Sequence, residues 1–137
     1  MDEARDLAVE VRGLTRTFDH FVAVDHIDLQ VPRGAVFGFL GPNGAGKSTT
    51  IRMLCGILQP TSGEGRVGGF DIVRQSEALK SHIGYMSQKF SLYEDLTVEE
   101  NLQFFAGVYG LVGSRRQRRI AWALEMAGLL GRERVMT

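Results

Sequence analysis

Two stretches near the beginning of the chain alternate apolar and polar residues with a period of two. Residues 9–14 read Val-Glu-Val-Arg-Gly-Leu, and residues 27–31 read Ile-Asp-Leu-Gln-Val. This alternation is typical of strands that bury one face and expose the other. The second stretch ends at Pro32-Arg33-Gly34, which has the composition of a turn. The pattern predicts two antiparallel strands ahead of residue 35.

Two further stretches are apolar without alternation. Residues 36–40 read Val-Phe-Gly-Phe-Leu, and residues 83–86 read Ile-Gly-Tyr-Met. Continuous apolar runs of this length are typical of strands buried on both faces, as in a parallel sheet. Between the two runs, glycines surround short predicted strands at residues 66–67 and 70–72, and residues 76–81 predict a short helix. The expected fold class is therefore α/β.

Beyond residue 88 the spacing of apolar residues becomes helical. Thr97-Val98-Glu99-Glu100 has the pattern of a capping box and predicts the start of a helix. A second box, of the S-x-x-Q type, at residues 114–117 predicts another helix that stops near Gly128. The face that this helix is expected to bury consists of Ile120, Ala121, Leu124 and Ala127. The order of elements indicates an α/β nucleotide-binding core followed by a helical region.

Residues 41–48 read Gly-Pro-Asn-Gly-Ala-Gly-Lys-Ser, which completes the phosphate-loop pattern G-x-x-x-x-G-K-[ST]. The loop lies between the apolar run 36–40 and residues 50–55, whose spacing predicts a helix that stops between residues 56 and 60. Glycines let the backbone turn its N–H groups toward a phosphate, and the start of the helix adds unpaired donors. Lys47 can bridge the β- and γ-phosphates, and the Ser48 hydroxyl can bind Mg²⁺. The loop predicts a nucleoside-triphosphate site.

The net charge of the chain is zero, which excludes attraction of a partner by the electrostatic field of the whole molecule. Sixteen basic and sixteen acidic residues cancel, so no net field attracts nucleic acid or an anionic membrane. No apolar run approaches the roughly 20 residues that cross a bilayer, and the first residues do not resemble a signal peptide. Cys55 is the single cysteine, and we expect it to pack in a buried helix. These features favour a cytosolic protein.

Four arginines cluster at positions 115, 116, 118 and 119. Nucleic-acid contact is one interpretation, but no aromatic platform is interleaved with the cluster, and we expect a solvated helix face. Trp122 and its apolar neighbours are expected in the core of the helical region. The three histidines show no metal-ligand spacing. Neither nucleic-acid binding nor a structural metal is therefore expected.

The filler residues of the phosphate loop and four other segments match one protein family. Residues 39–50 contain Pro42, Asn43 and Ala45 between the glycines. Residues 83–88 read Ile-Gly-Tyr-Met-Ser-Gln. Further matching segments are residues 23–25, 59–63 and 92–102. Together they resemble the Walker A motif, the Q-loop and the start of the helical subdomain of ABC transporter ATP-binding subunits, and are most similar to the bacterial drug and antibiotic exporter branch. The resemblance extends from about residue 7 to residue 131.

The resemblance implies a P-loop NTPase core of the ABC type with an antiparallel β subdomain and the beginning of an α-helical subdomain. Phe18 occupies the position of the aromatic residue that stacks on adenine, and Phe21 is a rival for that role. Gln88 matches the glutamine that completes Mg²⁺ coordination and senses the γ-phosphate, so Gln88 and Ser48 are the expected metal ligands and Gln88 and Lys47 the expected catalytic residues. The residues expected to hold ATP are Gly41, Pro42, Asn43, Gly44, Ala45, Gly46, Lys47, Ser48 and Thr49.

The resemblance also implies partners. A second ATP-binding subunit is expected to form a head-to-tail dimer with this one and to drive a separate transmembrane permease, at the cytoplasmic side of the cell membrane. Within residues 1–137, residues 7–88 would form the nucleotide-binding core, and residues 89–137 the Q-loop and the start of the helical subdomain. Residues 89–96 would face the permease. The transported substrate is chosen by the permease in this family, so the present sequence does not encode it.

Hydrolysis in this family needs motifs that do not occur in these 137 residues. They are an apolar run that ends in Asp (Walker B), a following Glu, a switch histidine and a Leu-Ser-Gly-Gly signature. We therefore expect a truncated molecule that binds Mg-ATP weakly at best, hydrolyses it negligibly and self-associates through uncovered strand edges and apolar surface. Two other functions stay open: a soluble ABC ATPase that acts on nucleic acid or ribosomes, and an inactive nucleotide-binding remnant.

Overall fold

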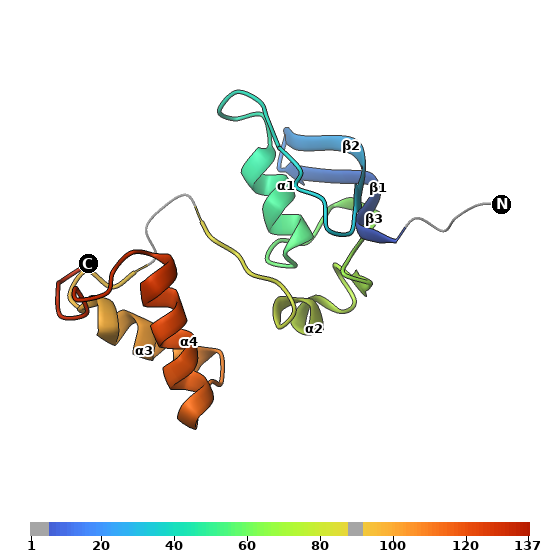
Figure 1. The fold of residues 1–137 in the computed structure, drawn as a ribbon. Helices are drawn as coiled ribbons and strands as arrows, with labels where there is room; N and C mark the ends of the chain where they lie inside the picture. Colours follow the sequence, from blue (N-terminus) through green and yellow to red (C-terminus); the bar gives the residue numbers. More distant parts are fainter. Residues whose placement is uncertain (1–5, 88–91) are drawn as a thin grey trace. The chain divides into compact units, whose positions relative to one another are not determined.

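The computed structural model describes residues 6–87 and 92–137. The chain forms two units, Met1–Met86 and Ser87–Thr137. Figure 1 shows the strands and the helices α1 and α2 in the first unit and the helices α3 and α4 in the second. The phosphate loop and the arginine cluster therefore belong to different units.

A four-stranded antiparallel sheet with the order β2-β1-β3-β4 forms the framework of the first unit. The strands predicted at residues 9–14 and 27–31 are confirmed as parts of a long hairpin, in which Phe18 pairs with Phe21 next to the turn. The two short strands predicted after the loop helix are confirmed as well. The strands are β1 (Leu7–Phe18), β2 (Phe21–Pro32), β3 (Ser62–Val67) and β4 (Phe70–Asp71).

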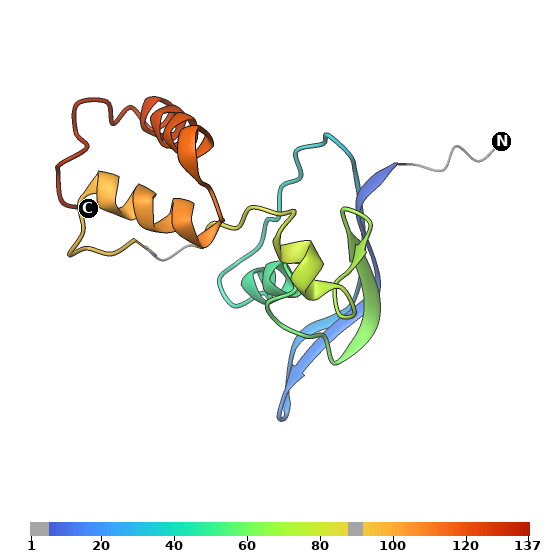
Figure 2. The ribbon, with the colours of Figure 1, turned by 90° about the horizontal axis from the view of Figure 1, so that it is seen from below.

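Two helices, α1 (Lys47–Leu54) and α2 (Ser76–Lys80), pack on one face of this sheet. Figure 2 shows both on the same side of the strands. The predicted stop of the loop helix is confirmed, because Gly56 adopts a φ of 67° and the Ile57 N–H donates to the Arg52 carbonyl at 2.9 Å. The buried core between the helices and the sheet consists of Val11, Leu14, Val24, Met53, Ile72 and Leu79.

The two continuous apolar runs do not form strands, and this prediction was wrong. Residues 36–40 and 83–86 have no regular secondary structure. Val36 is 103% and Leu40 94% exposed. A strand of this kind becomes stable only when neighbouring strands satisfy its backbone and helices cover both of its faces. No strand of the described residues pairs with either run, so most of their apolar side chains stay exposed, although Phe39 and Ile83 are half-buried and Ile83 packs against the core of the first unit.

Two helices, α3 (Val98–Val108) and α4 (Gly113–Met126), build the second unit. Its core is formed by Ala106 of α3 and by Ile120 and Leu124 of α4. The predicted capping box is confirmed: the Glu100 N–H donates to the Thr97 hydroxyl, and the Glu100 carboxylate accepts from the Thr97 N–H at 2.8 Å. Throughout the described part of the chain, every helix is too short or too polar to span a bilayer.

Several predictions for α4 were wrong. The helix begins at Gly113 after Val112, without a side-chain cap, so the box expected at residues 114–117 is not made. Ser114 already lies inside the helix, where its hydroxyl accepts from the Arg118 guanidinium at 3.2 Å. Trp122 is 53% exposed rather than in the core. Helical geometry explains this, because residues 120 and 124 share one face and residue 122 lies on the other.

Three small residues also differ from their predicted environment. Ala121 and Ala127 are exposed although they were expected on the buried face of α4. Cys55 is half-buried and follows the last residue of α1 instead of lying within a buried helix. Partial burial raises the pKa of the Cys55 thiol, which favours its neutral form. The predicted end of α4 at Gly128 is confirmed, since Gly128 has a φ of 66° after Ala127.

Candidate functional site

The phosphate loop folds back on itself immediately before α1. Its turn is closed by the Ala45 N–H, which donates to the Pro42 carbonyl at 3.2 Å. Gly46, the residue that precedes α1, has a φ of 83°. A Cβ atom at Gly46 would lie 2.3 Å from the carbonyl oxygen of Ala23 in β2. Only glycine combines this backbone angle with so close an approach to the sheet, so β2 fixes the position of the loop.

The first turn of α1 has no negative group of its own. No side chain caps the helix, and no acidic residue lies in its first turn. The buried Thr50 fixes the start of the helix, because both its N–H and its hydroxyl donate to the Gly46 carbonyl at 2.9 Å. The leading N–H groups of a helix lack intrahelical acceptors and carry a partial positive charge. This end of α1 is therefore suited to an anion such as a phosphate.

Lys47 places its ammonium group across the loop. The ammonium donates to the Pro42 carbonyl at 2.8 Å and also to the Gly41 carbonyl. Both acceptors belong to the loop that would surround a phosphate, so the positive charge is already positioned at its rim. A lysine acts on phosphates as a compact point charge and needs no fixed plane. The residues of the loop therefore fit a triphosphate.

Ser48 and Thr49 follow Lys47 in the first turn of α1, where Ser48 is exposed and Thr49 half-buried. The Ser48 hydroxyl is thus available as an oxygen ligand for a magnesium ion, which prefers hard oxygen donors. Among the residues that the structure describes, no group of three or more His, Cys, Asp or Glu side chains could hold a metal ion. The other predicted metal ligand, Gln88, lies outside the described residues.

Phe18 and Phe21 lie on either side of the hairpin turn between β1 and β2. Phe18 is 41% and Phe21 61% exposed. The Arg16 guanidinium lies 4.5 Å from the centre of the Phe18 ring and covers one face of it. Phe21 precedes Ala23 by two positions in β2, and Ala23 contacts Gly46. The hairpin therefore connects both aromatic candidates to the phosphate loop through a single strand.

Sequence reasoning missed two residues that position this region. The Ala23 carbonyl limits how closely the phosphate loop can lie to β2. The Arg16 guanidinium lies over the Phe18 ring and donates to the Gln59 carbonyl at 2.8 Å. Both act through contacts between distant parts of the chain. The motif itself contains no signal for either of them.

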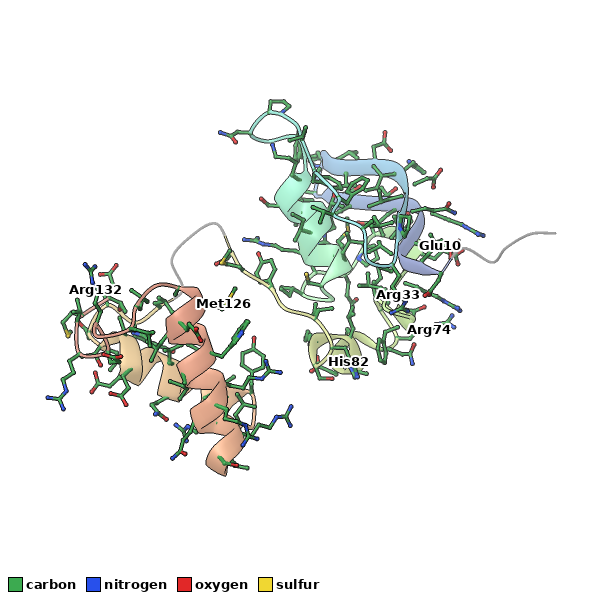
Figure 3. All side chains as sticks on the ribbon, viewed as in Figure 1. Glu10, Arg33, Arg74, His82, Met126 and Arg132 are labelled. Atoms are coloured by element: carbon green, nitrogen blue, oxygen red, sulfur yellow. The ribbon has the colours of Figure 1, made fainter. Side chains whose placement is uncertain are left out.

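A hollow of about 640 Å³ lies elsewhere, over β1, β3, β4 and the residues after β4. Three of its side chains are arginines and three are carboxylates, and Arg12 is paired with Glu10 at 2.7 Å. Figure 3 labels Glu10 and Arg74 of this hollow. Its charges cancel and none of its residues belongs to the phosphate loop. The loop is therefore the better candidate for binding a triphosphate. The hollow is lined by Glu10, Arg12, Gly63, Glu64, Gly65, Arg66, Asp71, Val73 and Arg74.

The model of the ABC transporter family matches residues 24–137. Among curated proteins, the chain is 52% identical over 124 residues to "Probable multidrug ABC transporter ATP-binding protein YbhF" of Escherichia coli, a match that covers 90% of this chain and 22% of the relative. It is 42% identical over 122 residues to "Daunorubicin/doxorubicin resistance ATP-binding protein DrrA" of Streptomyces peucetius, which covers 89% of this chain and 37% of the relative. The chain thus spans well under half the length of these relatives.

Solved structures show the same likeness. The structure of an ATP-binding subunit of an ABC transporter matches with a TM-score of 0.79 and 30% identity over 94% of this chain and 54% of its own. A dimeric ATP-binding cassette in a post-hydrolysis state, bound to ADP and Pi, matches with a TM-score of 0.78 and 25% identity over 94% of this chain and 61% of its own. The antiparallel sheet with its helices is therefore the fold of about half of an ABC ATPase domain.

Proposed function

The chain belongs to the ABC transporter family of ATP-binding proteins, and on that basis we propose that residues 41–49 bind ATP with Mg²⁺ to power an exporter. The observation that best supports this is the position of Lys47, whose ammonium group is held across the loop by the Gly41 and Pro42 carbonyls. The uncapped start of α1 adds a second positive feature beside it. Both features match the negative charge of a triphosphate.

Each residue of the loop has a proposed role. The ammonium of Lys47 would neutralise the β- and γ-phosphates, and the N–H groups at the start of α1 would orient them. Ser48 and Gln88 would hold the magnesium ion, which supplies positive charge to the phosphate oxygens when bound. Phe18 would stack on adenine with the face that Arg16 does not cover. Together these residues would grip the nucleotide at both of its ends.

The proposed partners are a second ATP-binding subunit and a transmembrane permease. The names of the two curated relatives describe multidrug transport and resistance to daunorubicin and doxorubicin, which favours export over import. The dimeric state of the matched ATP-binding cassette favours pairing of two such domains. The segment expected to face the permease is residues 89–96, of which residues 89–91 lie outside the described part of the chain. The peripheral position at the cytoplasmic side of the membrane belongs to this same proposal.

We further propose that the 137-residue chain binds ATP without turning it over. The Walker B segment, its following Glu and the switch histidine that the family uses for hydrolysis do not occur in these 137 residues. In this proposal, hydrolysis requires a base to activate water and a second set of residues to close the site. Steady-state release of phosphate by the purified chain should therefore equal the background of the Lys47→Ala variant.

Binding of a fluorescent ATP analogue tests the central claim. Lys47→Ala should weaken binding about tenfold or more, because it removes the charge-assisted hydrogen bonds to phosphate. Lys80→Ala is the matched control, since Lys80 pairs with Glu77 on α2 and lies outside the loop. Thermal unfolding shows whether each variant is folded, and ATP should raise the midpoint of the wild type and of Lys80→Ala. Equal affinity of the wild type and Lys47→Ala would refute the proposed site.

A further inference from the structure

The outward face of α4 changes from basic to apolar along its length. Residues 118, 119, 122 and 126 follow residue 115 at intervals of three, four, seven and eleven positions, which places all five on one side of a helix. Ile120 and Leu124 face the opposite way and are buried against α3. The exposed face, which we call the arginine–tryptophan face, consists of Arg115, Arg118, Arg119, Trp122 and Met126.

The basic half of this face is not neutralised by the rest of its unit. Within the described residues, Arg115, Arg118 and Arg119 form no ion pair, and the first turn of α4 contains no acidic residue. The fourth arginine of the cluster, Arg116, points elsewhere and donates to the Gln103 carbonyl at 2.8 Å. Glu125 is the acidic residue of α4, and it lies at the edge of the face rather than on it. A local positive field therefore exists although the whole chain is neutral.

The other half of the face exposes two large apolar side chains. Trp122 is 53% and Met126 69% exposed, and Figure 3 shows Met126 at the C-terminal end of α4. The Arg119 guanidinium lies 5.9 Å from the centre of the Trp122 ring. An indole ring beside cationic side chains is typical of the boundary between lipid headgroups and acyl chains, where the ring enters the apolar layer and the cations meet phosphates.

We propose that the arginine–tryptophan face binds the headgroup layer of an anionic phospholipid bilayer. This contact does not involve the nucleotide and stands apart from the proposed role of the phosphate loop. A convex helix face presents no groove for an extended peptide, and a single tryptophan provides no series of stacking platforms for bases. Its arginines match the charge of the lipid phosphates, and its Trp122 and Met126 match the apolar layer beneath them. The contact would hold the helical unit at the membrane surface.

Trp122 is the sole tryptophan of the chain, so its fluorescence reports directly on this face. The full 137-residue chain is titrated with phosphatidylglycerol vesicles and with phosphatidylcholine vesicles, at low and at high salt, and bound protein is measured by co-sedimentation. We expect binding to phosphatidylglycerol alone, a blue shift of the Trp122 emission on binding, and loss of both at high salt. Arg118→Gln combined with Arg119→Gln should weaken binding roughly thirtyfold.

Arg132→Gln combined with Arg134→Gln is the matched control, because it removes the same charge from the segment after α4, in which Figure 3 labels Arg132. This variant should bind as the wild type does. Circular dichroism confirms that both double variants remain helical.

The proposal is overturned by equal binding to both lipids, by equal losses in the two double variants, or by binding without a change in Trp122 emission. It is also overturned if Trp122 already emits as a buried side chain and vesicles do not alter it, because protein then covers the face. Binding of a single-stranded oligonucleotide with a blue shift, in the absence of any vesicle binding, would assign the face to nucleic acid instead.

Discussion

The side chain of Asn101 and the backbone of Tyr93 are joined by a pair of hydrogen bonds. The Tyr93 N–H donates to Asn101 Oδ1, and Asn101 Nδ2 donates to the Tyr93 carbonyl, both at 2.9 Å. Asn101 is 2% exposed in α3, and its amide also donates to the carbonyls of Leu96 and Thr97 and to the Thr137 hydroxyl. One buried side chain thus fastens the segment before α3 to the helix and to residue 137.

Asn101→Ala should therefore loosen this segment. The change leaves the Tyr93 N–H without its acceptor, whereas the Tyr93 carbonyl still accepts from the Leu96 N–H and the Thr137 hydroxyl. Loss of a buried hydrogen-bond partner costs about 1–3 kcal/mol. Hydrogen exchange measured by mass spectrometry should show reduced protection in peptides that contain residues 92–101. Gln117→Ala, at an exposed position of α4, should alter protection little. Unchanged protection in Asn101→Ala would contradict the role of this amide.

Because the phosphate loop lies close to β2, we expect alanine to destabilise the protein more at one of two glycines that have nearly the same φ. Gly44 has a φ of 84° and Gly46 a φ of 83°. Replacing either glycine by alanine lowers the free energy of unfolding by about 1–2 kcal/mol, because alanine disfavours the left-handed backbone conformation. Only Gly46→Ala also places a Cβ atom 2.3 Å from the Ala23 carbonyl, since nothing lies within 4 Å of a Cβ at Gly44. Gly46→Ala should unfold at the lower temperature in a thermal scan, and equal midpoints would show that the loop does not contact β2 in this way.

The proposed contact between Phe18 and adenine can be tested separately from the contacts with the phosphates. Phe18→Ala removes an aromatic platform, and base–aromatic stacking is worth about 1–3 kcal/mol, or roughly fivefold to a hundredfold in affinity. Phe18→Ala should thus weaken binding of ATP while leaving inorganic tripolyphosphate unaffected in a competition assay. Phe21→Ala is the matched variant across the turn and should have the smaller effect. A larger loss of ATP affinity in Phe21→Ala would assign the adenine contact to Phe21.

Local patterns predicted much of the antiparallel sheet because its strands pair with near neighbours in the sequence. The hairpin of β1 and β2 needs only alternation and a turn, and both can be read from residues 9–31. The apolar runs at residues 36–40 and 83–86 have a composition suited to burial, but a buried strand exists only where other strands flank it. Their conformation depends on the rest of a sheet, which a local pattern does not describe.

Prediction of the candidate site was limited in the same way, because a local motif does not describe contacts with distant parts of the chain. The motif at residues 41–48 predicted a phosphate loop because its residue types have a direct physical meaning. The contact between Ala23 and Gly46 joins residues that are distant in the sequence, and nothing in the motif indicates it. Trp122 was assigned to the core together with its apolar neighbours, without regard to its position around the helix. Its helical phase relative to Ile120 and Leu124 would have placed it on the exposed face.

The capping box of α3 predicts a specific loss of stability in acid. Hydrogen bonds from the Thr97 N–H and hydroxyl lower the pKa of the Glu100 carboxyl below its ordinary value of 4.5. A lowered pKa means that the charged form stabilises the folded state at pH values above 4.5, and that this contribution disappears as the pH falls through the lower folded value. Glu100→Gln should therefore lower the thermal midpoint at neutral pH and have little effect at the acid end. Glu99→Gln, in the same helical turn, is the control for a general effect of negative charge near the start of the helix. If the thermal midpoints of both variants depend on pH in the same way, the capping role of Glu100 is contradicted.

The uncovered apolar run at residues 36–40 predicts self-association of the 137-residue chain. Val36 and Leu40 are 103% and 94% exposed, and an unpaired apolar segment of this kind pairs readily with a second copy. Val36→Lys combined with Leu40→Lys should shift the mass measured by light scattering toward that of the monomer. The thermal midpoint should hardly change, because neither side chain contributes to the core. Val108→Lys combined with Leu130→Lys adds the same charge at exposed positions of the second unit. If this control reduces association equally, general charge repulsion explains the effect, and the run itself does not form the contact.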